Sequence, residues 1–590
     1  MTSILSAIAD EHGSTTTTLL HPPSSGRQWW RDAVIYQVYP RSFSDGSGDG
    51  VGDLPGITQR LDHLARLGVD AVWISPFYTS PQHDGGYDVA DYRDIDPVFG
   101  TLEDADALLA EADRLGIRVI VDLVPNHTSS SHAWFRDAIA AEPGSRERAR
   151  YIFRDGRGAH GDEPPNNWQS VFGGPAWTRL TTPDGAPGQW YLHLFDVTQP
   201  DLNWENPEVH AEIESVLRFW LDRGVAGFRI DVAHGMVKAD GLPDWSGTTA
   251  MLEGPHEGTA GSEDGSTGAG HRGPMWDQDG VHEIYRSWNR VLAQYDGDRV
   301  LVAEAWVEPV TRLARYVRPG ETHQAFNFDF LTSLWTTPAL RSVITESLEA
   351  NDAYDATTTW VLSNHDVVRH TSRLGLEPPG GKPNGIGKGD PQPDEKLGLQ
   401  RGRAATLLML ALPGSAYLYQ GEEMGLPEHT TLDDSERQDP TWPRSGHTQR
   451  GRDGCRVPLP WIADAPAYGF SPTGKSWLTQ PETFARYALD TQVCVAGSTY
   501  EMYRTALRLR REFRLGSGSL AWVDGLADSS DEHVLAFVNR EVLVVTNLGE
   551  PPLALPGGLE LLLASAEIHP DDDGVVTVPT DVTVWLRQRE

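Results

Sequence analysis

The segment Val-Ala-Gly-Phe-Arg-Ile-Asp-Val at residues 225–232 decides the fold and the chemistry that the sequence predicts. It is short and mostly apolar, which is typical of a buried strand, and side chains two apart on a strand share a face. Arg229 and Asp231 are therefore expected side by side, where the guanidinium keeps the carboxylate ionised at neutral pH. A covalent attack on a sugar carbon requires such a carboxylate. A structural ion pair is the alternative, and the other strands decide between the two.

The composition describes a large acidic protein. The chain has 590 residues, 39% of them hydrophobic, which is enough for more than one domain. Its 84 acidic and 49 basic residues give a formal charge of −35. Such a charge repels nucleic acid and anionic membranes, so neither is an expected partner, and no stretch is long and apolar enough to span a bilayer.

The cysteines and the N-terminus indicate a cytoplasmic location. Only Cys455 and Cys494 occur, which excludes a disulfide framework and favours a reducing compartment. The first 25 residues have neither a basic start nor a long apolar run, so residues 1–26 are expected to be a flexible tail and not a signal peptide. We expect a cytoplasmic monomer or homodimer.

Short apolar segments alternate with amphipathic ones along most of the chain. Strands are expected at residues 33–41, 71–77, 118–127, 225–232, 299–306, 325–330, 358–366 and 415–423. A helix near residues 57–67 ends at Gly68, and another begins at Thr101 with Asp104 as its capping partner. Eight strands that alternate with helices predict the α/β class and a (β/α)8 TIM barrel.

Other regions interrupt or follow this barrel. Residues 128–198, after the third strand, are polar, rich in Gly, Pro and Trp, and too long for an ordinary connection, which predicts an inserted domain B. The barrel, domain A, then comprises residues 27–127 and 199–514. Residues 254–273 are so rich in Gly, Ser and His that mobility is expected. Residues 515–590 alternate like antiparallel strands, which predicts a C-terminal β-sandwich, domain C.

Polar residues interrupt the apolar segments where the strands end. In a barrel of this kind the active site lies at the C-terminal ends of the strands. The residues at those ends are Asn126, His127, Arg229, Asp231, Glu304, His365 and Asp366. One of them alone could be a polar core residue, but buried unpaired charge is costly, so packing explains the whole set poorly.

Two of these carboxyl groups have different environments. Arg229 holds Asp231 ionised, whereas Glu304 lies in the apolar sequence Leu-Val-Ala-Glu-Ala-Trp, a setting that raises a carboxyl pKa and suits a general acid. Two such groups about 5–5.5 Å apart would hydrolyse a glycoside with retention of configuration.

Six segments carry a family resemblance. They are Tyr-Gln-Val-Tyr-Pro-Arg-Ser-Phe (36–43), Gly-Tyr-Asp-Val-Ala-Asp-Tyr (86–92), Asp-Leu-Val-Pro-Asn-His (122–127), Gln-Pro-Asp-Leu-Asn (199–203), Gly-Phe-Arg-Ile-Asp (227–231) and Ser-Asn-His-Asp (363–366). From about Trp29 into domain C, the chain closely resembles the α-amylase superfamily, glycoside hydrolase family 13. Within it, the chain is most similar to the α-glucosidase and oligo-1,6-glucosidase branch.

The resemblance implies roles for individual residues. Asp231 would be the nucleophile, Glu304 the acid/base, and Asp366 a third carboxylate that hydrogen-bonds the distorted sugar. Tyr87 would stack on the sugar ring, His127 and His365 would bind its hydroxyl groups, and Asp84 and Arg456 would close the pocket around the non-reducing end. Phe172, Phe195, Gln199, Arg229 and Val232 complete the implied substrate site.

A pocket with a closed end accepts only chain termini. The resemblance therefore implies a retaining exo-α-glucosidase that acts on small α-glucosides, and transglucosylation can accompany hydrolysis. The amylase branch carries Lys-His shortly after the nucleophile, but here Val232, Ala233, His234 and Gly235 follow. Val232 resembles the oligo-1,6-glucosidase choice, which predicts tolerance of α-1,6 bonds beside α-1,4 bonds.

The segment Asp-Gly-Ser-Gly-Asp-Gly-Val-Gly-Asp at residues 45–53 places oxygen donors at alternate positions, as hard cations prefer. It resembles the structural Ca²⁺ or Mg²⁺ loop of this branch. The implied ligands are Asp45, Ser47, Asp49, the Val51 carbonyl and Asp53. An acidic glycine-rich turn without metal is the alternative, and no organic cofactor is implied.

Two other functions fit parts of the pattern. A transglucosylase or a trehalose- or sucrose-isomerising enzyme would use the same covalent intermediate, and water access at the acceptor site separates it from a hydrolase. A non-catalytic subunit of this fold would carry a membrane helix and lack part of the acid set, whereas this sequence has the complete set and no such helix.

Overall fold

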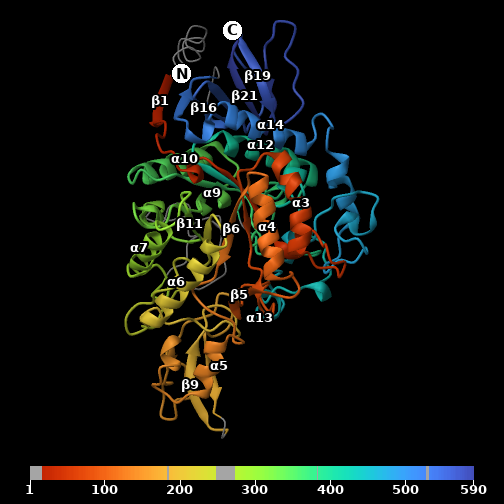
Figure 1. Cartoon of the computed structure of the whole chain (residues 1–590). Coiled ribbons are helices and arrows are strands. Elements are labelled where there is room, and N and C mark those ends of the chain that lie inside the picture. The colour runs from red at the N-terminus through yellow and green to blue at the C-terminus, as the bar shows by residue number, and fades with distance from the viewer. Residues whose placement is uncertain (1–15, 183–184, 248–272, 382, 527–530, 590) are drawn as a thin grey trace.

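The computed structural model describes residues 16–182, 185–247, 273–381, 383–526 and 531–589. Figure 1 shows a central barrel with a small domain projecting from one end and a β domain against the other. The mobility expected for residues 254–272 lies outside the described residues.

Eight parallel strands form the central sheet in the order β12-β11-β10-β6-β3-β2-β14-β13. Their bounds are β2 Val34–Val38, β3 Ala71–Ile74, β6 Arg118–Leu123, β10 Gly227–Ile230, β11 Val300–Ala303, β12 Gln324–Ala325, β13 Thr359–Val361 and β14 Ser415–Tyr419. A parallel bridge between Phe326 and Thr359 joins the two ends of this order. Inside it, Trp73, Ile120 and Val302 pack in one buried cluster. The predicted (β/α)8 barrel is confirmed.

The sixth strand is shorter than the sequence predicts. Only β12 pairs with β11, and Phe328–Thr332 forms the short helix α9. The side chain of Asn327 accepts a hydrogen bond from the Phe330 N–H at 3.0 Å, which caps this helix. The expected strand at residues 325–330 is therefore wrong in its second half, because an asparagine cap starts a helix there.

Helices surround the barrel and several of their ends lie where the sequence indicates, although α3 begins at Leu54 and not near Ile57. Gly68 ends α3 with φ 99°, and Thr101 and Asp104 form a reciprocal capping box at the start of α4. The longer helices are α3 Leu54–Leu67, α4 Leu102–Arg114, α6 Pro207–Asp222, α7 Val281–Leu292, α10 Thr337–Asp352, α12 Glu395–Ala411 and α14 Thr499–Glu512. Among the described residues, none of the helices combines the length and the apolar character needed to cross a membrane.

Domain B leaves the barrel after β6. It contains α5 Ala133–Ala140 and a three-stranded antiparallel sheet of β7 Phe153–Arg154, β9 Pro187–Leu192 and β8 Trp177–Thr181. It stays attached near its base, where His127 bridges to Asp201 and Tyr151 to Leu202. These bridges fix domain B beside the C-terminal ends of the barrel strands.

Domain C is built on a six-stranded antiparallel sheet in the order β1-β15-β16-β17-β21-β19. Its strands are β1 Thr16–His21, β15 Leu520–Asp524, β16 Val534–Asn539, β17 Val542–Asn547, β19 Leu559–Ala564 and β21 Val582–Gln588, with a smaller sheet of β18 Leu553–Ala554 and β20 Thr577–Val578. It packs on α12, where the Trp585 indole N–H donates to the Leu407 carbonyl at 3.1 Å.

The N-terminal segment differs from the expected flexible tail. Residues 16–21 form β1 and pair with β15 along the edge of the domain C sheet. The His21 Nδ1 atom then lies 2.8 Å from a carboxylate oxygen of Asp352 on α10. Threonines suit a strand, and an exposed sheet edge offers unpaired backbone groups, so this segment is ordered by pairing. Residues 1–15 lie outside the described residues.

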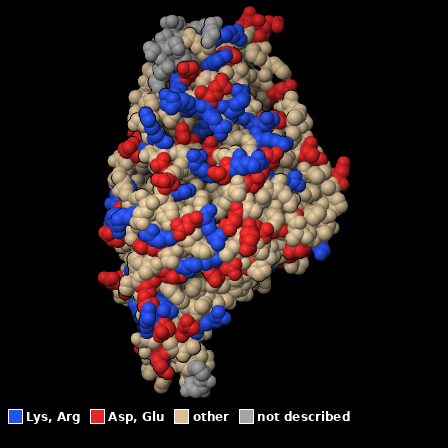
Figure 2. All heavy atoms as spheres, viewed as in Figure 1, with Lys and Arg blue, Asp and Glu red and all other residues tan. Residues whose placement is uncertain are grey.

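The surface in Figure 2 carries basic and acidic side chains interleaved. The exposed arginines of α14 each have an acidic neighbour: Arg504 pairs with Glu501 at 2.8 Å and Arg508 pairs with Glu512 at 2.7 Å. These basic side chains are therefore compensated locally.

Candidate active site

A cavity opens at the C-terminal ends of the barrel strands, beside domain B. It is lined by Asp84, Tyr87, His127, Val171, Phe172, Phe195, Asp231, Val232, His234, Glu304, Trp306, Asp366 and Arg452. Residues from eight separate parts of the chain meet here, and the three predicted catalytic carboxyl groups are among them. The barrel brings them together because each follows the end of a strand.

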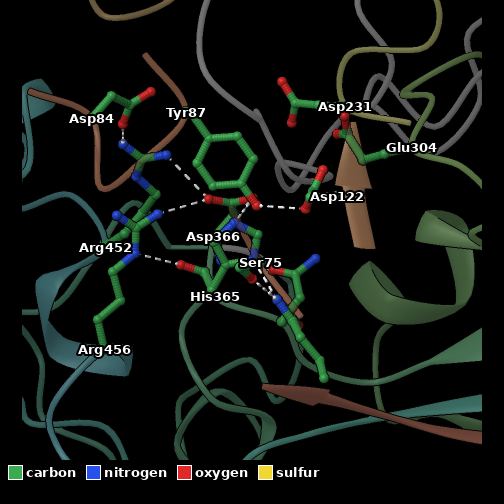
Figure 3. A network of polar contacts seen from close by, with 12 residues as sticks. Ser75, Asp84, Tyr87, Asp122, Asp231, Glu304, His365, Asp366, Arg452 and Arg456 are labelled. Carbon is green, nitrogen blue, oxygen red and sulfur yellow. Dashed lines mark hydrogen bonds and ion pairs between the residues drawn. The ribbon is translucent and has the colours of Figure 1, made fainter. Parts of the chain in front are cut away.

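Arg229 places two of these carboxyl groups around one guanidinium. Its Nη1 atom lies 2.7 Å from Asp231 Oδ1, and its Nη2 atom lies 3.7 Å from Glu304 Oε2. Asp231 follows β10 and Glu304 follows β11, and these two strands pair in parallel. Adjacent strands therefore present the two acids to the same cavity, as Figure 3 shows.

The environment of Asp231 differs from the one that the sequence predicts. Burial raises the pKa of Asp231 to about 6, against the opposing effect of Arg229, and the negative charge of Asp122 adds to the rise. Arg229 cannot lower the pKa further because it also binds Asp122, with Nη1 at 3.0 Å from Oδ1. A pKa of about 6 still leaves roughly nine-tenths of the carboxyl groups ionised at pH 7.

The environment of Glu304 agrees with the sequence. Burial, helped by the charges of Asp231 and Asp366 and opposed by Arg229, raises the pKa of Glu304 to about 8. The backbone N–H of Val232 donates to Glu304 Oε2 at 2.7 Å, which fixes the carboxyl group in place. At neutral pH the cavity therefore holds an ionised Asp231 beside a protonated Glu304.

Asp366 is the third acid of the cavity. Burial acts to raise its pKa, but His365, Arg452 and Arg456 outweigh burial and lower the pKa below its ordinary value. Arg452 Nη1 lies 3.1 Å and Arg456 Nη2 lies 3.0 Å from Asp366 Oδ1. This carboxylate stays ionised and can accept hydrogen bonds from sugar hydroxyl groups.

The residue that pairs with Asp84 is Arg452, not the predicted Arg456. Arg452 Nη2 lies 2.7 Å from Asp84 Oδ1, and Figure 3 shows Arg452 between Asp84 and Asp366. Arg456 is not among the lining residues of the cavity, and its Nε donates to the His365 carbonyl at 2.8 Å. Both arginines belong to Arg-Asp-Gly-Cys-Arg, so the motif alone did not choose between them.

Besides Arg456, three predicted residues lie behind the lining: Gln199, Arg229 and His365. Gln199 Nε2 donates to Asp84 Oδ2 at 3.0 Å and lies 3.2 Å from His127 Nε2. The His365 ring stacks on the Tyr87 ring, with centroids 5.2 Å apart. These three side chains position lining residues, whereas Tyr87, His127, Phe172, Phe195 and Val232 face the cavity themselves.

Four lining residues were not predicted: Val171, His234, Trp306 and Arg452. His234 lies three residues after Asp231, and its ring stacks on Trp276 with centroids 5.0 Å apart. Trp306 lies two residues after Glu304 and stacks on Phe328 at 3.8 Å. Their positions just beyond the acids at the strand ends are the signal that could have found His234 and Trp306.

The loop at residues 45–53 folds as a tight turn before α3. Asp45 accepts hydrogen bonds from the N–H groups of Gly48 at 2.6 Å and Gly50 at 2.8 Å, and Asp53 accepts one from Gly56 at 2.7 Å. Within the described part of the chain, no three His, Cys, Asp or Glu side chains are grouped as a metal would require. The two end carboxylates hold the turn by backbone hydrogen bonds.

Comparisons with known proteins agree with this geometry. The model of the α-amylase catalytic domain matches residues 37–516. A probable α-glucosidase of Rhizobium meliloti is 39% identical over 86% of this chain and 87% of its own. An oligo-1,6-glucosidase of Parageobacillus thermoglucosidasius is 32% identical over 92% and 95%.

The solved structure of an α-glucosyl transfer enzyme superposes with a TM-score of 0.80 and 36% identity, covering 96% of this chain and all of the other. The match to the family model spans most of the chain. It begins within β2 and includes the other seven barrel strands. The protein therefore belongs to the α-amylase family of catalytic domains.

Proposed function

We propose that the protein is a retaining, exo-acting α-glucosidase of small α-glucosides. The observation that carries the proposal is the pair of carboxyl groups at one cavity, with Asp231 ionised and Glu304 protonated at neutral pH. Two acids with separated pKa values provide a nucleophile and a proton donor. The names of the relatives, α-glucosidase and oligo-1,6-glucosidase, support this activity.

The reaction would proceed in two steps. An Asp231 oxygen attacks the anomeric carbon while Glu304 gives its proton to the departing glycosidic oxygen, which leaves a glucosyl ester on Asp231 and an ionised Glu304. Glu304 then takes a proton from water, the water oxygen attacks the same carbon, and the ester bond to Asp231 breaks. Two inversions give net retention. Asp366 accepts hydrogen bonds from the sugar hydroxyl groups throughout.

The end of the cavity favours chain termini. We place this end at the ion pair of Asp84 and Arg452 and the rings of Phe172 and Phe195, which line the cavity together. The Arg452 guanidinium also lies over the Phe172 ring, 5.3 Å from its centroid. A wall built from four separate chain segments in this way supports exo-action.

A substrate panel tests the proposal. We expect hydrolysis of maltose and isomaltose with glucose as the first product, because a closed pocket binds the terminal unit of either. Soluble starch should react more slowly per bond, since only its ends can enter. Release of long internal fragments from starch, or inertness toward both disaccharides, would contradict the proposal. Chromatography of early products distinguishes these outcomes.

Transglucosylation is the second candidate activity. Trp306, stacked on Phe328, and Val232 give part of the cavity an apolar lining that can hold a sugar acceptor in place of water. The similar α-glucosyl transfer enzyme supports this reading. The same panel, run at high maltose concentration, would show transfer as trisaccharide formed beside glucose.

We also propose that the loop at residues 45–53 binds Ca²⁺ or Mg²⁺ as a structural ion. Its support is the alternation of oxygen donors in Asp45, Ser47, Asp49, Val51 and Asp53, although Asp45 and Asp53 already accept backbone N–H groups. The ion would join residues of the turn that precedes α3 and so resist its unfolding.

Calcium should therefore raise the melting temperature of chelator-treated protein. The rise should be lost in Asp49→Ala, because Asp49 is exposed and its removal spares the fold while deleting a ligand. Equal melting temperatures with chelator and with calcium would refute the site. Differential scanning calorimetry measures these melting temperatures directly and needs no substrate.

We propose a cytoplasmic location because the two cysteines do not form a disulfide. Both are free thiols, and Cys494 is exposed. A reducing compartment keeps such a thiol unpaired.

A further inference from the structure

A short helix of the barrel contacts domain B beside the closed end of the cavity. This helix is α13, Thr441–Arg444, in the long connection after β14. Figure 1 shows α13 at the end of the barrel from which α5 and β9 project. The connection is therefore placed to contact domain B.

Arg444 makes that contact with its whole guanidinium group. Nη1 lies 3.0 Å from Asp196 Oδ2, while Nη2 and Nε donate to the Gly173 carbonyl at 2.8 and 3.2 Å. The side chains of Arg444 and Asp196 are only 20% and 13% exposed. A planar donor that binds a carboxylate and a carbonyl together fixes orientation as well as distance.

The two anchors of Arg444 adjoin cavity residues. Gly173 follows Phe172, and Asp196 follows Phe195. The two phenylalanine rings meet edge to face with centroids 5.7 Å apart. A shift of Gly173 or Asp196 away from the barrel would carry one of these rings out of the cavity wall.

The N-terminal end of the segment 439–444 contacts Arg452, which the barrel contributes to the cavity wall. Asp439 lies just before α13 and accepts a hydrogen bond from the Thr441 N–H at 2.8 Å, and its carboxylate also binds the Arg452 side chain. Arg452 in turn binds Asp84 and lies over Phe172. Residues 439–444 thus connect Arg452 on the barrel side to Gly173 and Asp196 on the domain B side.

We propose that Arg444 is a specificity-determining positioning residue that latches domain B against the barrel and keeps the glucosyl pocket closed at its far end. Arg444 does not touch the reacting atoms, so the latch acts on the binding of the terminal sugar and not on the chemical step. The inference rests on the proposed exo-α-glucosidase activity. The effect of Arg444 on the binding of the terminal sugar can nevertheless be measured without that activity.

The test compares two latch variants with a matched control. Arg444→Met removes the guanidinium, and Asp196→Asn removes the charge of its partner at nearly constant shape. Arg223→Met is the control, because it makes the same change at a guanidinium of similar exposure that pairs with Asp106 at 2.6 Å on the outside of the barrel. Each protein is assayed for maltose hydrolysis, for opening of a cyclic α-glucan that has no chain end, and for glucose binding by calorimetry.

Both latch variants should raise KM for maltose about tenfold while kcat stays within about twofold of wild type. They should also weaken glucose binding by a similar factor and open the cyclic glucan measurably faster than the control. A KM and a glucose affinity equal to those of Arg223→Met would overturn the latch.

The two failures remain distinguishable. A wild-type protein that does not cleave maltose would refute the proposed function, while the glucose titrations would still decide the latch. If Arg444→Met melts well below wild type, Asp196→Asn alone carries the comparison, because it keeps the size of the side chain.

Discussion

Asparagine in place of Asp231 is expected to lower kcat for maltose about 10⁴-fold or more, because an amide cannot form the glucosyl ester. The substitution preserves the shape of the side chain, and Arg229 retains Asp122 as an ionic partner at 3.0 Å. The fold and the binding of glucose should therefore survive. Initial rates of glucose release, with glucose affinity measured separately, give both quantities.

The matched control for this variant is Asp106→Asn. Asp106 is an exposed acid on α4 that pairs with Arg223 on the outside of the barrel. It carries the same chemical change without contact to the cavity, so its kcat should equal that of wild type. If Asp231→Asn kept kcat within tenfold of this control, Asp231 could not be the nucleophile.

Glutamine in place of Glu304 is expected to lower kcat/KM for maltose by roughly 10²–10⁴-fold, the usual contribution of a positioned general acid. The loss should be much smaller for an aryl α-glucoside whose leaving group needs no proton. The first step then becomes fast and the second slow, so the glucosyl ester on Asp231 should accumulate. Comparison of the two substrates in one assay separates a lost proton donor from a disturbed site.

The pH profile distinguishes the same roles. Wild-type activity needs Asp231 ionised and Glu304 protonated, so kcat/KM should fall below about pH 6 and above about pH 8. These limbs belong to the pair as a unit, since the two groups interact through Arg229. Glu304→Gln should lose the alkaline limb and keep the acid limb. An unchanged alkaline limb in this variant would assign it to another group.

Much of the barrel could be predicted from periodicity alone. Buried strands such as β10 and β11 are short apolar segments, and helices such as α3 and α4 carry their caps within their own sequence. The candidate acids were predictable for the same reason: Asp231, Glu304 and Asp366 break apolar strands at their C-terminal ends. The barrel topology then requires those ends to meet.

Features that depend on the partner of a residue could not be predicted. Arg452 and Arg456 are four residues apart in one motif, and only the folded connection shows which of them reaches Asp84. Asp231 has a raised pKa because it is buried, and because Asp122, from a neighbouring strand, adds its negative charge and shares Arg229. The N-terminal strand β1 gains its order from β15, some 500 residues away along the chain. Local sequence carries no signal for any of these contacts.

The central claim is that Asp231 and Glu304 act as a nucleophile and acid/base pair on one glucosyl unit. The most direct measurement is the anomeric form of the glucose released from an aryl α-glucoside, whose leaving group is not a sugar, followed by proton NMR before mutarotation. A covalent ester on Asp231 predicts α-glucose, because two inversions restore the starting configuration. Release of β-glucose as the first product would show a single direct displacement by water and would contradict the account.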